Sequence, residues 1–383
     1  MKKILFVVDE NKIGGVSTVL QDLLNHLDYS NKTIDVLILH NSGNCLKNIP
    51  HNVNIIYGTP FFDIIDENLI DLLKSKLWLK ILRKLYLIFL MKTGLIKNRI
   101  IKERHKMFNE VYDIEVAFKY GFCTFFTYYG FSKKKINWIH CDCKVNDPGK
   151  KYRRLLTKIL KEYDINITLS KSIDNNFNSI YNCQNSIIIN NIIDENKINK
   201  VIKNIKYKPT KYIKFLSVGR LSYIKGYQVL IKALNLIKKD GLIEKIRLTL
   251  IGDGEYKEEL VKLVKEYDLN KYVIFLGKKI PPYRYIKNSD CFIMSSISEA
   301  YPLVLIESFI IGVPVLCTTI ASAHEMIDDN KNGIIVENSI KGLYSGILNL
   351  INNPDKILNM KKQLINYKYK NDIIMEQINK ILS

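Results

Sequence analysis

Short runs of β-branched and other apolar residues alternate with helical periodicity along almost the whole chain. This alternation is typical of βαβ units, in which buried parallel strands are joined by helices. In the first half we expect strands near 4–8, 34–39, 53–56, 114–118, 136–140, 165–169 and 187–189. A second series begins with "IKFLSVGRL" and continues near 248–251, 273–276, 291–295 and 314–317. The sequence therefore predicts an α/β protein.

The chain of 383 residues is long for a single hydrophobic core. A polar passage rich in Asn and Lys, "NNIIDENKINKVIKNIKYKPTKY", separates the two series of strands and is the expected hinge. We therefore expect two Rossmann-like domains, the first over residues 1–190 and the second over residues 191–365. A C-terminal helix within 366–383 is expected to pack back on the first domain.

The formal net charge of +20 is compatible with nucleic acid, an anionic membrane or a polyanionic small substrate as a partner. The chain is also rich in Lys, Ile and Asn, so about half of the basic excess can be attributed to biased composition. Because no RNA-binding or helix-turn-helix signature organises the charge, no nucleic-acid partner is expected.

The seven cysteines are scattered and odd in number, which fits a reducing cytosol better than a disulfide framework. In "HCDC", Cys141 and Cys143 stand beside His140, but no second ligand pair lies at zinc spacing. We therefore expect a cytoplasmic protein without a structural zinc ion.

No segment of the sequence is expected to cross a membrane. The apolar run of "MKKILFVVDE" ends at Asp9 and is interpreted as a buried strand, and "LYLIFLM" is far shorter than the ~20 residues of a spanning helix. The basic and apolar segment 69–92, however, could lie on the inner face of an anionic membrane. A core-packed helix with a basic, solvated face explains this segment equally well, and both interpretations remain open.

A cluster of glycines and cations follows the first strand of the second series. In "SVGRLSYIKGYQVLIKAL", Gly219 and Arg220 come at a strand end, and Lys225 and Gly226 come at a helix start. A strand end that leads into a helix N-terminus is where α/β sheets bind anions. Arg220 can form a bidentate contact with phosphate, and Lys225 can add a mobile charge. Two solvent-facing cations beside a turn are the simpler alternative.

Three further strand ends carry glycine turns. Gly14 and Gly15 in "NKIGGVSTVLQDLL" let a backbone approach a ligand, although a dinucleotide fingerprint is absent. "LIGDGEYKEEL" contains Asp253, which suits a helix start better than a metal site. In "FLGKKIPPY", main-chain groups near Lys279 and Ile280 could meet a planar base.

Two glutamates stand eight positions apart in "SSISEAYPLVLIESFIIGVPVLCT". Glu299 falls on a loop after a strand, and Glu307 falls about one turn into a helix that starts near Pro302. Carboxylates accept hydrogen bonds from hydroxyls, so the pair could hold two sugar rings. Stabilisation of a helix end by charge is the simpler explanation for either glutamate alone.

Taken in order, "SVGRLSYIKGYQVLIKAL", "LIGDGE", "VIFLG" and "SEAYPLVLIESFIIGVPVLCT" resemble the donor domain of glycosyltransferase family 4 over about residues 212–330. The first half is similar more loosely, through "IGGV", "NWIHCD" and "TLSKS". This chain departs from the family's usual pattern in "SEAYP" and "NIID". The resemblance implies a GT-B fold, in which two parallel sheets face a central cleft, and a retaining enzyme that uses a nucleoside-diphosphate sugar without a metal or other cofactor.

The resemblance also implies roles for individual residues. It makes Arg220, Lys225, Glu299 and His140 the candidate catalytic residues, with the two cations on the donor diphosphate. It places Glu299 at the transferred sugar and Glu307 at the ribose hydroxyls. The implied donor-binding set is Gly14, Gly15, Gly219, Asp253, Lys279, Ile280, Ala300, Tyr301, Pro302, Leu303 and Glu307.

The function expected from the sequence is transfer of a hexose or N-acetylhexosamine to a growing bacterial surface glycan, such as a capsule, exopolysaccharide or lipopolysaccharide, with a lipid-linked acceptor. Two alternatives remain open. A GT-B relative with epimerase or phosphorylase chemistry would share the fold, and a non-enzymatic protein that binds membrane or nucleic acid would explain the charge.

Overall fold

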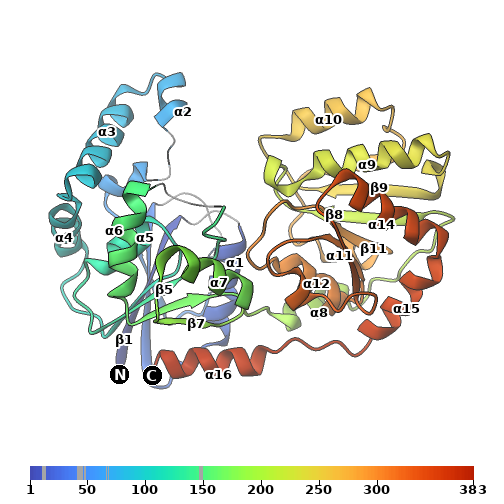
Figure 1. Ribbon diagram of the computed structural model, residues 1–383. Coiled ribbons are helices and arrows are strands. Elements are labelled where there is room, and N and C mark those ends of the chain that lie inside the picture. Colours follow the sequence, from blue (N-terminus) through green and yellow to red (C-terminus); the bar gives the residue numbers. More distant parts are fainter. Residues whose placement is uncertain (11–13, 41–45, 47–48, 66, 68, 146–149) are drawn as a thin grey trace. The chain divides into compact units, whose positions relative to one another are not determined.

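The computed structural model describes residues 1–383 except 11–13, 41–45, 47–48, 66, 68 and 146–149 (Figure 1). The chain forms two compact units. The first contains Met1–Ile192 and Asn371–Ser383, and the second contains Ile193–Lys370. Each unit is built on a parallel sheet with helical connections, so the predicted α/β class is confirmed.

The sheet of the first unit has the strand order β3-β2-β1-β4-β5-β6-β7, and its neighbouring strands pair in parallel. Its strands are β1 (Lys2–Glu10), β2 (Lys32–His40), β3 (Val53–Tyr57), β4 (Ile114–Ala117), β5 (Lys134–Trp138), β6 (Ile165–Thr168) and β7 (Ser186–Ile188). Its helices are α1 (Gly15–His26), the 3-10 turn η1 (Pro60–Ile64), α2 (Leu69–Lys74), α3 (Trp78–Thr93), α4 (Ile96–Met107), α5 (Phe122–Tyr128), α6 (Lys150–Lys161), α7 (Lys171–Tyr181) and the C-terminal α16 (Asn371–Ile381).

The sheet of the second unit has the order β10-β9-β8-β11-β12-β13, again with parallel pairing. Its strands are β8 (Ile213–Val218), β9 (Ile246–Ile251), β10 (Val273–Phe275), β11 (Cys291–Met294), β12 (Val315–Thr318) and β13 (Gly333–Val336). Its helices are α8 (Glu195–Ile202), η2 (Tyr223–Lys225), α9 (Tyr227–Lys239), η3 (Ile243–Lys245), α10 (Lys257–Glu266), α11 (Tyr283–Lys287), α12 (Leu303–Ile311), α13 (Ala323–Met326), α14 (Ile340–Asn352) and α15 (Pro354–Leu364).

The expected strands are confirmed, and one strand was missed. The run "GIIV" of β13 follows directly on the polar stretch "DDNKN", and its four residues are too few to show a period. β13 pairs along the whole of β12, from Val315 with Gly333 to Thr318 with Val336. Tertiary pairing rather than local pattern therefore defines this edge strand.

Strand β11 shows why both faces of the second sheet are apolar. Cys291 and Ile293 belong to the core on one face, together with buried residues of α9, α10 and α14. Phe292 and Met294 belong to the core on the other face, together with residues of α11 and α12. Because side chains alternate along a strand, a run without polar residues is what a sheet covered on both sides requires.

The chain order of the strands reverses once in each sheet, between β1 and β4 in the first unit and between β8 and β11 in the second. In open parallel sheets, ligands bind beyond the carboxyl ends of the strands that flank such a reversal. The stretches after β8 and after β11 carry the two main motifs of the second unit, so the topology brings these motifs to one place.

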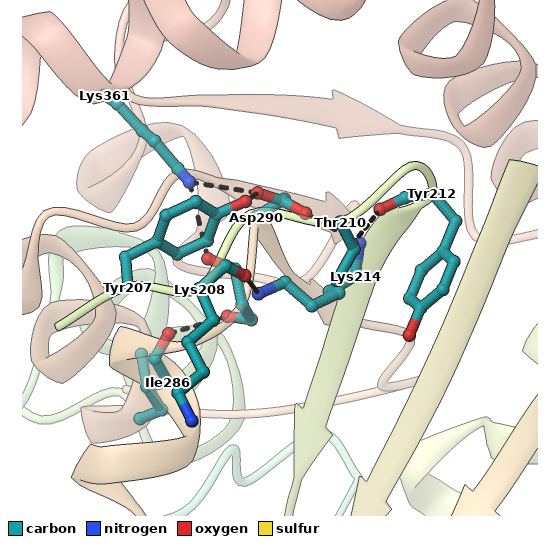
Figure 2. A network of polar contacts seen from close by, with 9 residues as sticks. Tyr207, Lys208, Thr210, Tyr212, Lys214, Ile286, Asp290 and Lys361 are labelled. Atoms are coloured by element: carbon teal, nitrogen blue, oxygen red, sulfur yellow. Dashed lines mark hydrogen bonds and ion pairs between the residues drawn. The ribbon is translucent and has the colours of Figure 1, made fainter. Parts of the chain in front are cut away.

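The opposite, amino end of the same two strands is closed by a network around Asp290 (Figure 2). This carboxylate accepts hydrogen bonds from the Lys214 amide at 2.8 Å, the Tyr207 hydroxyl at 2.5 Å and the Lys361 ammonium at 3.3 Å. The Lys214 ammonium donates to the Lys208 carbonyl and lies 4.1 Å from the centre of the Tyr207 ring. The network ties the segment before β8 and helix α15 to the start of β11.

The segment 69–92 forms two helices, α2 and α3, separated by residues 75–77 rather than one continuous helix. Lys76 adopts a left-handed backbone with φ of 55° at this break. No helix in the described part of the chain is both long enough and apolar enough to cross a membrane.

Candidate active site

The turn η2 after β8 is fastened to the strand end of β11. Gly226 has φ of 67°, and a Cβ at this position would lie 1.9 Å from the Ser295 carbonyl oxygen. The Ser295 hydroxyl donates to the Lys225 carbonyl at 2.9 Å, and the Ile297 amide donates to the Ile224 carbonyl at 2.8 Å. Only glycine combines the left-handed backbone with this close approach, so Gly226 fixes where Lys225 stands.

Lys225 and Glu299 form an ion pair. The Ser296 hydroxyl also donates to Glu299 Oε1, at 3.2 Å. The exposed fractions of the two ion-paired side chains are 25% and 19%, so the pair is accessible from one side while its stems are packed. The structure thus joins two residues that are 74 positions apart in the sequence and that were both predicted to be catalytic.

Arg220 is exposed, and no hydrogen bond or ion pair of its guanidinium occurs among the residues that the structure describes. Gly219 leaves room beside it, because a Cβ there would lie 2.9 Å from the Tyr227 hydroxyl and 3.6 Å from Lys225 Cε. Gly252, after β9, comes equally close, since a Cβ on it would lie 1.8 Å from the Gly219 carbonyl oxygen. The glycines therefore allow the strand ends to pack tightly behind two cations.

Glu307 lies on α12, about one turn from its N-terminus, as predicted. Its carboxylate accepts a hydrogen bond from the Tyr283 hydroxyl at 3.3 Å, and Tyr283 itself is buried at the start of α11. Pro302 is the N-cap residue of α12. The N-terminus of this helix supplies main-chain amides and a positive dipole end near both glutamates.

The loop between Glu299 and α12 is held by packing and by a contact between two tyrosines. Ala300 is buried, and the Tyr301 hydroxyl lies 3.0 Å from the Tyr369 hydroxyl. Burial raises the pKa of Tyr301 to about 12, so this contact joins two neutral phenols at neutral pH. Tyr369 lies in the connection that precedes α16, so its contact with Tyr301 links the loop to this connection. The Tyr369 amide also donates to Glu195 Oε1 at 3.0 Å.

The remaining predicted donor-binding residues of the second unit lie at its surface. Lys279 and Ile280 are exposed after β10. Asp253 follows β9 and pairs with Lys257 at 3.5 Å, in the first turn of α10. Leu303, the first residue of α12, is partly buried. The contact of Asp253 is that of a helix-start charge.

In the first unit, Gly14 and Gly15 form the exposed N-terminus of α1, beyond the carboxyl end of β1. No atom of the residues that the structure describes lies within 4 Å of a Cβ built on either glycine. The Thr18 hydroxyl donates to the Gly14 carbonyl at 3.0 Å. Residues 11–13, which belong to the same motif, lie outside the described part of the chain.

His140 lies two residues beyond β5. Its ring stacks on Trp138 with 5.9 Å between centroids and an angle of 12°, and it lies 4.9 Å from the Phe118 ring. Burial, followed by the nearby charge of Lys119, lowers the pKa of His140 to about 3. Its Nε2 atom is buried without a hydrogen-bond partner among the described residues. His140 is therefore a neutral imidazole that can accept or donate one further hydrogen bond.

The roles of two residues that position the site, Thr318 and Asn338, were not predicted from the sequence. The Thr318 hydroxyl, at the end of β12, donates to the Ser296 carbonyl at 2.7 Å. Asn338 donates to the Ser296 and Ile297 carbonyls at 3.3 and 3.2 Å. A strand-end Thr is a weak signal, and nothing local marks Asn338, because its partners are about 40 residues away.

Among the described residues, no group of three or more His, Cys, Asp or Glu side chains could hold a metal ion. The six described cysteines are free, and Cys45 lies outside the described residues. The Cys141 side chain, together with burial, raises the pKa of the Cys143 thiol. A neutral thiol is a poor metal ligand.

Comparison with known families and proteins gives a match over most of the second unit. Residues 199–371 match the family described as glycosyl transferases group 1, and the limits of this match nearly coincide with those of the second unit. Over 152 residues the chain is 38% identical to the N-acetylgalactosamine-N,N'-diacetylbacillosaminyl-diphospho-undecaprenol 4-alpha-N-acetylgalactosaminyltransferase of Campylobacter jejuni, covering 39% of this chain and 40% of that protein. An uncharacterized glycosyltransferase of Methanocaldococcus jannaschii is 29% identical over 368 residues, which cover 89% of this chain and 86% of the relative.

The chain spans about half, or less, of the first curated relatives that it matches, namely 40%, 55% and 37% of their lengths. Solved structures match over the full length. Anabaena HepE in complex with UDP-glucose has a TM-score of 0.73 at 18% identity, covering 100% of this chain and 99% of that one. WaaG, a glycosyltransferase involved in lipopolysaccharide biosynthesis, has a TM-score of 0.66 at 15% identity and covers 99% of both chains. These matches show that the fold is GT-B, as predicted.

Proposed function

We propose that the protein is a retaining glycosyltransferase that moves a hexose or N-acetylhexosamine from a nucleoside-diphosphate sugar to a growing bacterial surface glycan. The observation that carries the proposal is the joining of Lys225 with Glu299 beside the unpaired Arg220, at the strand ends of the group 1 domain. Relatives named for colanic acid, amylovoran and O-antigen biosynthesis support a surface glycan as the product.

The chemistry follows from where negative charge develops. When the bond between sugar and diphosphate breaks, the sugar becomes cationic and the leaving diphosphate gains charge. Arg220 and Lys225 stabilise this charge more strongly in the transition state than in the bound substrate. Glu299 orients Lys225 and accepts hydrogen bonds from the transferred sugar, while Glu307 accepts hydrogen bonds from the ribose.

The proposal includes the first unit as the acceptor-binding part. The neutral His140 positions the donor or polarises a hydroxyl, and Gly15 lets the N-terminus of α1 approach the diphosphate. The helix N-termini and cations take the place that a metal ion has in other transferases, so the reaction needs neither metal nor cofactor. The name of the Campylobacter relative, which includes a diphospho-undecaprenol, supports a lipid-linked acceptor and a peripheral position on the inner face of the plasma membrane.

A panel of nucleotide sugars tests the proposal. One member should stabilise the protein in a thermal melt, because a ligand at 100 times its dissociation constant adds ~2.7 kcal/mol. The same donor should lose its sugar intact to an acceptor, with release of free nucleoside diphosphate and retention of the anomeric configuration. If no nucleoside diphosphate and no nucleotide sugar shifts the melt, the donor assignment is wrong. Release of phosphate or of an epimerised nucleotide sugar would indicate phosphorylase or epimerase chemistry.

A further inference from the structure

Basic residues are concentrated in one part of the first unit. Residues 69–107, which span α2, α3 and α4, contain eleven Lys and Arg against Asp71 and Glu103. Their net charge of +9 is nearly half of the +20 of the whole chain, although they make up about a tenth of it. Biased composition would spread the excess evenly, so this concentration indicates a local partner.

Helix α3 is apolar on two sides. One side is buried in the core of the unit through Ile81, Leu87 and Leu90. The other side exposes large apolar residues at helical spacing, with exposed fractions of 69% for Trp78, 78% for Leu79, 62% for Leu82, 47% for Leu85, 45% for Tyr86 and 53% for Phe89. A helix packed only on its own core would carry polar residues there, and an apolar surface of this kind marks an interaction site.

A cavity of about 370 Å³ adjoins this exposed stripe. Arg83 and Tyr86 of α3 line it, together with Arg99, Glu103 and Lys106 of α4 and an apolar wall that includes Phe61. Because residues three and four apart are neighbours on a helix, Arg83 and Tyr86 lie next to the stripe residues Leu79 and Leu82. The volume suits a small polar group rather than a long chain.

The cavity has spare hydrogen-bond donors. Buried Glu103 is already paired, with Arg99 at 2.9 Å and Lys106 at 3.0 Å. Burial raises the pKa of Glu103, but neighbours that include Lys106 and Arg99 outweigh burial and lower it, so the carboxylate is charged. Arg83 is exposed, and no hydrogen bond or ion pair of its guanidinium occurs among the described residues.

The cations thus outnumber the anion by three to one at this cavity. Arg99 is held in place, since its guanidinium also stacks 4.6 Å from the centre of the Phe61 ring. A pre-oriented guanidinium next to a second guanidinium that has no partner among the described residues is suited to phosphate oxygens.

We propose that this cavity binds the phosphate group of an anionic membrane lipid while the exposed stripe of α3 enters the acyl layer beside it. The occupant is a lipid rather than a soluble phosphate, because the cavity alone would need no apolar stripe at its side. A nucleic acid would equally leave the six exposed apolar side chains without a role. Basic residues above an apolar helix face are the pattern of helices that lie in an anionic membrane interface.

This site extends the proposed position at the membrane and rests on that part of the proposed function, but not on the transfer reaction. It can therefore be tested with vesicles alone. Vesicle binding without sugar transfer would refute only the proposed reaction. Sugar transfer without vesicle binding would refute only the lipid site.

The test measures binding of the full chain to vesicles of phosphatidylglycerol and phosphatidylcholine, compared with phosphatidylcholine alone. The cavity variant carries Arg83→Gln and Lys106→Gln. The matched control carries Lys97→Gln and Lys102→Gln, two exposed residues of α4 that do not line the cavity. Both variants lose two positive charges, so a purely electrostatic attraction would weaken equally in both. We expect the cavity variant to bind at least ~10-fold more weakly than the control, because it loses charge-assisted hydrogen bonds to phosphate.

Two further arms separate the lipid from other sources of phosphate. Leu79→Ser with Leu82→Ser should abolish vesicle binding without changing the thermal melt, since both side chains are exposed. Glycerol phosphate should compete only at millimolar concentration. Equal weakening in the cavity variant and the control, or competition by glycerol phosphate as strong as that of vesicles, would overturn the proposal. Arg83→Gln alone repeats the test if the double variant is unstable, because Arg83 is exposed.

Discussion

The two ends of strands β8 and β11 carry similar residues in different states. At the amino end, Asp290 accepts hydrogen bonds from a backbone amide, a phenol and a lysine, and the groups around it are paired within the protein (Figure 2). At the carboxyl end, Lys225 pairs with Glu299, but Arg220 is exposed and unpaired in the described part of the chain.

The difference shows how one pair of strands separates stability from function. A lysine and a carboxylate that are paired within the protein stabilise the fold and have little capacity left for a ligand. A lysine and a carboxylate beside an unpaired arginine and helix N-termini retain capacity for an anion. Residue type alone therefore does not distinguish the two ends.

The largest expected effect is at the carboxyl end. Alanine at Arg220 or at Lys225 should lower turnover on the order of 100-fold or more, because each loses a charge partner of the leaving diphosphate. The thermal melt should hardly change for Arg220→Ala, since that side chain is exposed. Steady-state kinetics of the variants, with the exposed Lys232→Ala of α9 as a charge-matched control, checks this. Near-normal turnover in both variants would show that Arg220 and Lys225 do not stabilise the leaving diphosphate.

At the amino end the effect should be on stability. Asp290→Ala leaves three donors without their acceptor in a site where the Asp290 side chain is only 13% exposed, and should lower the free energy of unfolding by ~2–3 kcal/mol. Turnover per folded molecule should stay unchanged. Tyr207→Phe, which removes one of the hydrogen bonds, should cost ~1 kcal/mol. Denaturant unfolding measures both, and Asp268→Asn, which breaks an exposed ion pair and tolerates the left-handed backbone of this position, should not differ from wild type.

The two glutamates sharpen the comparison within the carboxyl end. Glu307→Gln should weaken nucleoside-diphosphate binding about 10-fold, whereas Glu299→Gln should slow turnover about 10-fold with little change in that binding. Calorimetry and kinetics on the same preparations separate the two effects. Because Glu299 pairs with Lys225, a variant that changes both Lys225 and Glu299 should lose less turnover than the summed losses of the two single variants. Additive losses would mean that the ion pair has no role in turnover.

The smallest expected effect concerns His140. Its pKa in the folded protein is about 3, below the unfolded value near 6.5, so between these values the unfolded chain binds a proton that the folded chain does not. Stability from this residue is therefore complete above pH 6.5 and falls as the pH is lowered. From pH 7 to pH 5.5, wild type should lose about 1 kcal/mol more than His140→Gln. Parallel stability profiles of the two proteins would show that His140 is not held neutral by the fold.

Most of the fold could be predicted because its signal is local. Apolar runs and helical periods mark strands such as β8 and β11, while Gly219 marks a tight strand end and Gly226 a helix start. The edge strand β13 was missed because its four residues become a strand only through pairing with β12. The break between α2 and α3 was missed as well, since apolar residues continue through it without a Pro or Gly.

The chemistry of the site was readable only as residue types. The sequence by itself determined the α/β class, the order of the motifs and the candidate cations and carboxylates. Only the tertiary structure decided that Lys225 forms an ion pair with Glu299 and that Asp290 is hydrogen-bonded within the network at the amino end of the strands. The physical reason is that β8 and β11 become neighbours by parallel pairing across about 70 residues of chain, and such a pairing depends on the packing of the whole sheet.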